Sequence, residues 1–261
     1  MSNLDHAPLL RRGRPLKRWR YVGVYGPELM LCGGDLRVGP LRRRFWALAD
    51  PGGGLRERGA LLGSAGVGVE PRGLRIRARG VKAAIEIGEG TPVDVVSRHG
   101  GGPIWTRKRA GVPARGSVAI DGHERRVDAA AVVDESAGYH ARHTAWRWSA
   151  GVGRTDDGGA VAWNLVAGIH DGPTGSESAI WREGEPREVG PVEFAPDLSS
   201  VAFAEGGALR FSPWSSLEHR TNALVVRSRY RQPFGTFAGE LPGGLRLAEG
   251  YGVMEEHDVW W

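Results

Sequence analysis

The sequence predicts an all-β protein built from antiparallel strands. Glycine supplies 41 of the 261 residues, about 16%, where ~7% is ordinary. No stretch of about twelve residues keeps a helical period without a glycine or proline interrupting it. Alternating or apolar runs instead recur at a spacing of roughly 8 to 12 residues, with glycine-rich turns between them. This pattern is typical of barrels and sandwiches and argues against folds that alternate strands with helices.

Three turns are expected to join β-hairpins, because glycine and aspartate accept the positive φ that tight turns demand. The only helical candidate is a short stretch over residues 215–226. The expected hairpins are 117–120 with 123–127 across Asp121-Gly122, 146–153 with 160–169 across Asp156–Gly159, and 201–205 with 208–211 across Gly206-Gly207.

The length fits two small barrels or one extended double sheet, and a long meander must protect its edges against aggregation. We expect a mobile basic tail over residues 1–18, a first β-barrel over 19–113 and a second over 114–261. The junction is placed at Gly-Val-Pro-Ala-Arg, residues 111–115, close to the point where the charge changes sign. No fixed-period repeat occurs, which disfavours a propeller or solenoid.

Charge divides the chain into unlike halves. Residues 1–130 hold 24 Lys and Arg against 12 Asp and Glu, a net charge of +12, whereas residues 131–261 hold 11 against 18, a net charge of −7. This asymmetry is compatible with two modules whose opposed fields help them dock, or with a basic module that binds polyanions. Arginine accounts for 32 of the 35 cationic residues, which fits codon bias as well as phosphate recognition, and no nucleic-acid partner is predicted.

The remaining composition narrows the class further. The single cysteine, Cys32, excludes an internal disulfide and a cysteine-based zinc or iron–sulfur site, which indicates a reducing compartment. We expect no signal peptide and no membrane span, since uncharged runs fall far short of ~20 residues. A cytoplasmic location is therefore predicted, with transient contact with a membrane surface left open.

Motifs for metals, nucleotides and nucleophiles are missing. His140-x-x-His143 has the spacing of a ligand pair, but on a strand i and i+3 point to opposite faces, so no metal is predicted. No Gly-x-Ser-x-Gly occurs. The glycines of residues 63–68 are in the wrong order for a phosphate loop, and no cofactor is predicted.

Tryptophan is unusually frequent, with ten residues against five Tyr and six Phe. The two-residue period of a strand places Trp146 and Trp148 on one face and Arg147 on the other. In one interpretation the tryptophan face packs between sheets; in the other, a barrel interior carries His, Arg and Asn around a ligand, with indoles as walls. The expected partner strand is divided in the same way, with Val161, Trp163, Leu165 and Ile169 opposed to Asn164, Val166 and His170.

Four segments carry a resemblance: residues 19–23, 106–109, 138–151 and 250–255. They resemble a bacterial family known as domain of unknown function 2804, over nearly the whole chain. That family is distantly similar to the carotenoid 1,2-hydratase, AttH-like and tocopherol cyclase group, which implies a calycin-type fold of two lipocalin-like β-barrels. In the wider group the second barrel begins with Asp-His-x-aromatic-Gly.

The corresponding stretch here is residues 134–138. Asp134 and Gly138 match the motif, while Glu135 replaces its histidine and Ala137 its aromatic residue. The resemblance implies binding of an isoprenoid- or lipid-like molecule in a tryptophan-lined barrel, with acid-catalysed hydration or cyclisation of an alkene.

Such chemistry needs a protonated acid, aromatic faces for a cation and control of water. Asp134 and Glu135 are the candidate acid pair, since paired or buried carboxyls have raised pKa values. His140 or His143 would pass protons. The candidate ligand-binding residues are Tyr139, Trp146, Arg147, Trp148, Trp163, Asn164, His170 and Glu255.

Two other function classes remain open: a lipid-binding protein without catalysis, and an interaction protein with a filled core. In these, Asp134 is a turn residue that binds backbone N–H groups and Glu255 pairs with an arginine. The pocket-based functions require a cavity of more than ~300 Å³.

Overall fold

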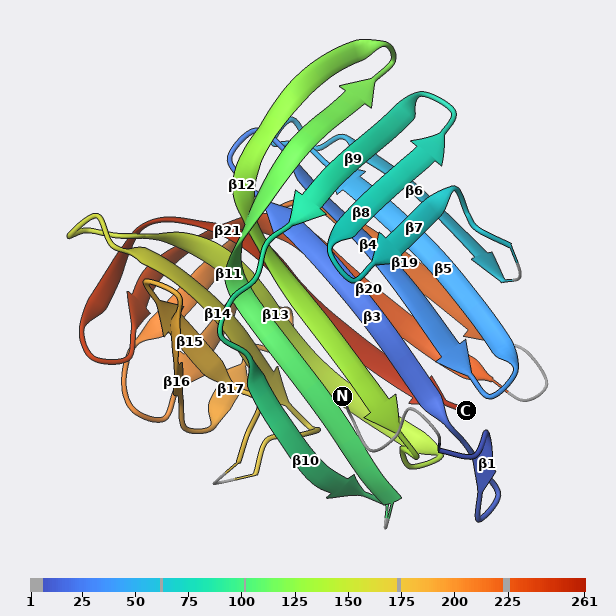
Figure 1. The fold of residues 1–261 in the computed structure, drawn as a ribbon. Coiled ribbons are helices and arrows are strands. Elements are labelled where there is room, and N and C mark those ends of the chain that lie inside the picture. Colours follow the sequence, from blue (N-terminus) through green and yellow to red (C-terminus); the bar gives the residue numbers. More distant parts are fainter. Residues whose placement is uncertain (1–6, 62, 101, 173–174, 223–225) are drawn as a thin grey trace.

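The computed structural model describes residues 7–61, 63–100, 102–172, 175–222 and 226–261. These residues form antiparallel strands and no helix, in two large curled sheets that pack against each other (Figure 1). We call the ten-stranded sheet the first half-barrel and the nine-stranded sheet the second half-barrel. The predicted fold class, all-β and antiparallel with two lipocalin-like barrels, is confirmed.

The first half-barrel has the strand order β6-β5-β4-β3-β12-β11-β9-β8-β7, and β10 also pairs with β11. A separate two-stranded hairpin, β1 (Leu10–Arg11) with β2 (Arg14–Pro15), precedes it. The strands of the first half-barrel are β3 (Lys17–Tyr25), β4 (Met30–Val38), β5 (Leu41–Ala49), β6 (Leu55–Leu61), β7 (Val67–Glu70), β8 (Gly73–Ala78), β9 (Val81–Ile87), β10 (Val93–His99), β11 (Gly102–Ile120) and β12 (His123–Gly138).

The second half-barrel has the order β16-β15-β14-β13-β21-β20-β19-β18-β17. Its four longest strands, β13, β21, β20 and β19, are neighbours in that order. The strands are β13 (His143–Thr155), β14 (Ala160–Ala167), β15 (Ala179–Arg182), β16 (Glu185–Glu188), β17 (Val192–Phe194), β18 (Ser200–Phe203), β19 (Ala208–Asn222), β20 (Arg227–Leu241) and β21 (Leu245–Trp260).

The three predicted hairpins are confirmed. At the β11–β12 turn Ile120 pairs with His123, and Asp121 and Gly122 both have positive φ, 50° and 89°, as a type I′ turn requires. The helical candidate over residues 215–226 is wrong as far as the structure describes it, because residues 215–222 belong to β19 and pair with β20. Residues 223–225 lie outside the described residues. A full-length partner strand outweighs the weak helical propensity of this stretch.

The chain passes from the first half-barrel to the second at residues 139–142, between β12 and β13. The junction predicted at 111–115 lies inside β11, which continues through a bulge between Ala110 and Val112. Within the expected basic tail, residues 10–15 form the β1–β2 hairpin and Lys17 begins β3 with a buried side chain; residues 1–6 lie outside the described residues. Where the chain divides into folding domains stays a prediction.

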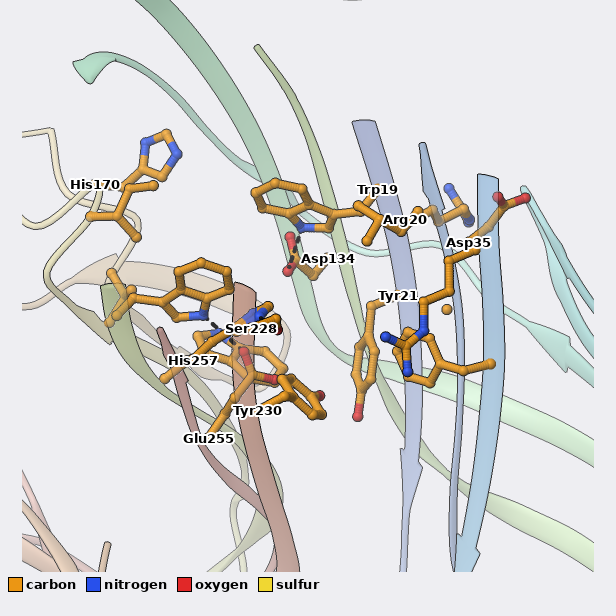
Figure 2. A pocket seen from close by; sticks show the side chains of 18 of the residues that line it. Trp19, Arg20, Tyr21, Asp35, Asp134, His170, Ser228, Tyr230, Glu255 and His257 are labelled. Carbon is orange, nitrogen blue, oxygen red and sulfur yellow. Dashed lines mark hydrogen bonds between the residues drawn. The ribbon is translucent and has the colours of Figure 1, made fainter. Parts of the chain in front are cut away.

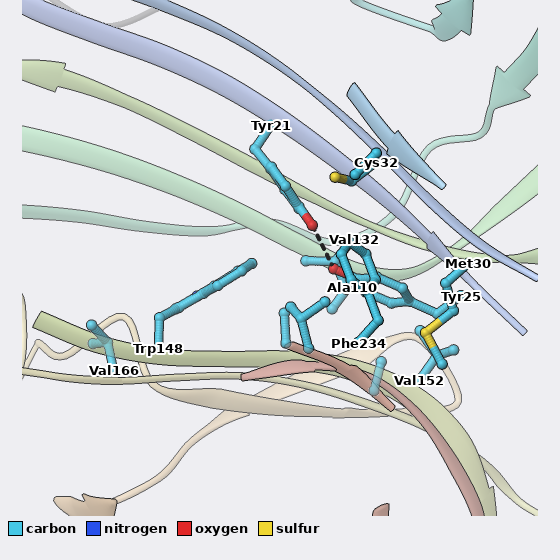
Figure 3. Packing of buried hydrophobic residues seen from close by; sticks show 14 of the residues in the cluster. Tyr21, Tyr25, Met30, Cys32, Ala110, Val132, Trp148, Val152, Val166 and Phe234 are labelled. Carbon is cyan, nitrogen blue, oxygen red and sulfur yellow. Dashed lines mark hydrogen bonds between the residues drawn. The ribbon is translucent and has the colours of Figure 1, made fainter. Parts of the chain in front are cut away.

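Three clusters of buried side chains hold the molecule together. One fills the first half-barrel and is mainly aliphatic, with Leu74 and Ile85 among its members. A second fills the second half-barrel around Trp163 and Phe237. The third lies between the half-barrels and takes residues from both, including Tyr25 and Trp148 (Figure 3). The half-barrels are thus filled inside, and both contribute to the layer between them.

No helix of the described chain is long and apolar enough to cross a bilayer.

Candidate functional site

A pocket lies between the two half-barrels (Figure 2). Trp19 and Tyr21 of β3 form part of one side, and Trp146, Trp148 and Tyr230 of the second half-barrel face them. Its volume is about 140 Å³, so this pocket does not meet the requirement of more than ~300 Å³ stated above for the pocket-based functions. The face of β13 that carries Trp146 and Trp148 packs between the two sheets and also lines the pocket. The pocket thus lies between the half-barrels and not inside a barrel.

Strand alternation brings the indoles to the pocket. Trp146 and Trp148 are two residues apart on β13 and share its buried face. The Trp148 Nε1 donates to Asn164 Oδ1 at 2.8 Å, and the Trp146 Nε1 donates to Glu255 Oε1 at 2.8 Å. Both N–H groups are satisfied by neighbours, and the indoles present apolar surface to the pocket.

Glu255 of β21 is a buried carboxyl, 8% exposed. Besides Trp146, the Tyr230 hydroxyl donates to its Oε2 at 2.9 Å and Gln232 Nε2 donates at 3.0 Å. No cation of the described chain forms an ion pair with it; its partners are neutral, not the arginine considered above. Burial raises its pKa to about 7, although the hydrogen bonds from Tyr230 and Trp146 oppose the rise. Glu255 can therefore hold a proton at neutral pH.

A second carboxyl cluster surrounds Lys108 of β11. Its buried ammonium donates to Asp134 of β12 and to Glu177, the latter at 3.2 Å, and the Trp19 Nε1 donates to Asp134 at 3.1 Å. Burial raises the pKa of both carboxyls, Lys108 opposes the rise, and the charge of Glu177 adds to it at Asp134. One cation cannot neutralise two carboxylates, so this trio favours a state that retains a proton.

Two histidines that line the pocket are neutral bases. His170 Nδ1 lies 2.8 Å from Ser97 Oγ, and His257 Nε2 lies 2.8 Å from Ser228 Oγ. Burial lowers the pKa of each to about 3. Neither imidazole is protonated at neutral pH, and with pKa values this low both serve as neutral hydrogen-bonding groups beside the acids.

Of the predicted catalytic residues, only Asp134 lies on the pocket. Asp134 is in the middle of β12, paired with Lys108 and Tyr21 across the sheet, and is not a turn residue. Glu135 points to the other face, where it forms an ion pair with Arg20, because neighbouring residues of a strand alternate. The predicted Asp134–Glu135 carboxyl pair does not form. Glu177 is the second carboxyl instead.

The two other predicted proton carriers are also away from the pocket. His143 has a largely exposed side chain that pairs with Asp258 at 2.9 Å. His140 is buried behind Trp19, with its ring centre 5.0 Å from that indole, and burial lowers its pKa well below the ordinary value.

The predicted ligand-binding residues divide into two groups. Trp146, Trp148, His170 and Glu255 line the pocket. The other four do not line it: Tyr139 donates to the Pro8 carbonyl at 2.6 Å, Arg147 pairs with Glu256, Trp163 packs on Phe237 inside the second half-barrel, and Asn164 holds Trp148. The assigned roles of all these residues stay predictions.

The prediction missed Lys108, Glu177, Tyr230 and His257. A signal existed for Lys108, since Ile104, Thr106 and Ala110 share its strand face and are all buried. The chain has three lysines among 35 cations, and two of them, Lys17 and Lys108, are buried. No comparable pattern surrounds Glu177, which lies in the irregular segment between β14 and β15.

Solved structures share this architecture. A structure described as a putative AttH from Nitrosomonas europaea is 16% identical, with a TM-score of 0.63 over 98% of this chain and 99% of that one. Kievitone hydratase from Nectria haematococca is 11% identical, with a TM-score of 0.58 over 91% of this chain and 88% of that one. At these identities the likeness concerns the fold.

Comparison of sequences adds the family. No curated protein matches the chain. The family of the domain of unknown function DUF2804 matches residues 103–261, which is more than half of the sequence and includes Lys108, Asp134, Trp146 and Glu255. The protein is therefore a member of the DUF2804 family.

Proposed function

We propose that the protein binds a hydrophobic small molecule, or the apolar end of a larger one, between its half-barrels and protonates an alkene carbon of it from Glu255. The observation that carries this proposal is the state of Glu255: a buried carboxyl with three neutral hydrogen-bond donors, no cation partner among the described residues and a pKa raised to about 7. It lies on an indole-lined pocket.

Because the pocket is smaller than the ~300 Å³ required to enclose a whole drug-sized ligand, the proposal is restricted to a small molecule or to one end of a larger one. An engineered apolar cavity of about 150 Å³ accommodates benzene, and this pocket has about 140 Å³. It therefore fits one ring or one isoprene unit. A larger isoprenoid or lipid would place one end in the pocket and leave the remainder where the pocket opens, beside partly exposed residues such as Leu36 and Arg43.

Glu255 supplies the proton in the proposed step. The Glu255 O–H bond breaks and its proton forms a C–H bond with one alkene carbon, which leaves a carbocation on the other carbon and a carboxylate on Glu255. The faces of Trp146 and Trp148 stabilise the cation. In hydration a water oxygen adds to the cation, and the proton that water loses returns to Glu255; in cyclisation a second double bond of the ligand adds instead, and loss of a ring proton to Glu255 completes the cycle.

The fold comparison supports this choice only by analogy, because one fold hosts many functions. Kievitone hydratase is a hydratase by its name and shares the double-barrel architecture. The chemistry assigned to this chain depends on its own Glu255, Trp146 and Trp148.

The test uses exchange with heavy water. The protein is purified without detergent, copurifying apolar molecules are identified by native mass spectrometry, and these or a panel of monoterpene alkenes are incubated with it in D₂O. We expect deuterium at an alkene carbon, and loss of this incorporation by about 100-fold or more in Glu255→Gln, with ligand binding retained.

The matched control is Glu256→Gln. Glu256 is the next residue of β21, pairs with Arg147 and does not line the pocket, so its substitution should leave incorporation unchanged. Binding without incorporation in the native protein would show a binding protein without catalysis and overturn the acid role. Absence of any bound apolar molecule would overturn the proposal as a whole.

A further inference from the structure

We propose that the rim of the molecule at which the pocket opens docks on an anionic lipid bilayer. The rim is the set of strand ends at Lys17, Val38, Leu41 and Gly138 in the first half-barrel and at His143, Asn222, Arg227 and Trp260 in the second, together with the β1–β2 hairpin. The first four residues are paired with one another across adjacent strands, so they lie along one edge of the first half-barrel. The second four are paired in the same way along one edge of the second half-barrel. Only residues 139–142 separate Gly138 from His143, so both sheets end on the same side (Figure 1).

The pocket reaches this rim. Leu36 lies two residues from the end of β4, Ser228 one residue from the start of β20, and Trp261 directly after β21; all three line the pocket and are partly exposed. Lys108 and Glu177, which also line the pocket, are 2% and 3% exposed. A surface that covered the rim would therefore face the pocket opening.

Apolar side chains gather on the rim. Four of the six exposed large hydrophobic side chains of the described residues lie there: Leu9, Leu10, Leu41 and Trp260, which are 58%, 63%, 50% and 48% exposed. They come from three separate segments that the fold brings to one side: the β1–β2 hairpin, the start of β5 and the end of β21. Leucine and tryptophan beside cationic residues are typical of surfaces that insert shallowly at a membrane interface.

Arginines accompany them. Arg37 lies opposite Arg42 in the register of β4 and β5, and Arg220 lies opposite Arg229 in that of β19 and β20. Like charges directly opposite each other destabilise a sheet. Asp35 neutralises Arg42. Within the described ranges, no ion pair engages the exposed rim arginines Arg11, Arg12, Arg37, Arg220, Arg227 and Arg229.

Exposed leucines together with exposed arginines indicate which kind of partner fits the rim. A nucleic acid or an acidic protein would match the arginines, but neither requires exposed leucines among them. A bilayer with anionic head groups matches both, because phosphates pair with guanidinium groups and the leucines enter the acyl boundary. The docking rests on the rim alone and does not depend on which ligand the pocket takes or on the proposed chemistry.

The experiment is co-sedimentation of the full chain with vesicles of phosphatidylcholine alone or with 30% phosphatidylglycerol. We expect the protein to bind the anionic vesicles at least about tenfold more tightly than the vesicles of phosphatidylcholine alone. Arg220→Glu with Arg229→Glu should remove most of that preference, and Leu10→Ser with Leu41→Ser should weaken binding to the same vesicles. The control is Arg125→Glu with Arg126→Glu, at the β11–β12 hairpin, far from the rim (Figure 1).

Thermal unfolding of each variant confirms that it folds. Equal sedimentation with neutral and anionic vesicles, no sedimentation with either, or an equal loss in the Arg125/Arg126 control would overturn the proposal. So would binding to a DNA duplex that matches or exceeds binding to the anionic vesicles, because it would show that the arginines act without the leucines.

Discussion

The two buried carboxyl sites on the pocket differ in how their charge is compensated. Asp134 and Glu177 share the ammonium of Lys108, whereas Glu255 receives only neutral donors from Trp146, Tyr230 and Gln232. A buried carboxylate without a cation is costly, so its pKa rises until it keeps its proton. The ammonium of Lys108 compensates part of the negative charge of its two carboxyls, whereas Glu255, with neutral partners and a pKa of about 7, can donate a proton near neutral pH.

The largest effect is expected from removing the shared cation. Lys108→Met leaves Asp134 and Glu177 buried without their ion-pair partner, and loss of one partner of a buried pair costs about 3–5 kcal/mol. Urea unfolding at pH 7 should show this loss, and a smaller one at pH 4, where the carboxyls are protonated more readily. Arg107→Met is the control, since Arg107 and its partner Asp94 are both partly exposed, and should cost no more than about 1 kcal/mol. Equal losses in the two variants would contradict the comparison.

Glu255→Gln should change stability in the opposite direction. The native pKa of about 7 exceeds the ordinary value of 4.5, so the native state binds a proton that the unfolded chain releases, and the native protein loses stability as the pH rises from about 4.5 through 7. The variant lacks this loss. It should gain free energy of unfolding over the native protein at pH 8, by up to about 3 kcal/mol, with little gain at pH 4.5. A pH-independent difference would show that the carboxyl is not buried as described.

Tyr230→Phe should sharpen the same assignment. The Tyr230 hydroxyl donates to Glu255 and lowers its pKa, so its removal should raise the pKa of Glu255 further, by about one unit. The carboxyl signal of ¹³C-labelled glutamate, followed by NMR against pH, measures this shift. Tyr251→Phe, whose hydroxyl contacts exposed Glu249, should leave the Glu255 titration in place.

The smallest effect is expected at His143. Its imidazole is 44% exposed, pairs with an exposed Asp258 and does not line the pocket. His143→Ala should change the free energy of unfolding by less than about 1 kcal/mol and leave ligand binding and deuterium incorporation unaltered. A loss of incorporation with unchanged stability would restore the proton-carrier role that the sequence suggested.

Local chemistry determined much of the fold in advance. The Asp121-Gly122 turn follows from the positive φ that these residues tolerate, and the shared face of Trp146 and Trp148 follows from the two-residue period of a strand. The same period excludes a joint role for Asp134 and Glu135, and it marks Lys108 as buried once its strand is recognised. Each of these conclusions depends on residues within a few positions of one another.

The site itself was decided by tertiary structure. The pocket forms where two sheets pack together, and it joins Trp19 to Asp134, Lys108 to Glu177 and Trp146 to Glu255, pairs that are 115, 69 and 109 positions apart in the chain. The pKa of Glu255 depends on how completely both sheets exclude water from it and on which donors reach it. No local period encodes these contacts. Trp19–Asp134 and Trp146–Glu255 depend on which distant strands pair within each sheet, and Lys108–Glu177 depends on how the second half-barrel is placed against the first.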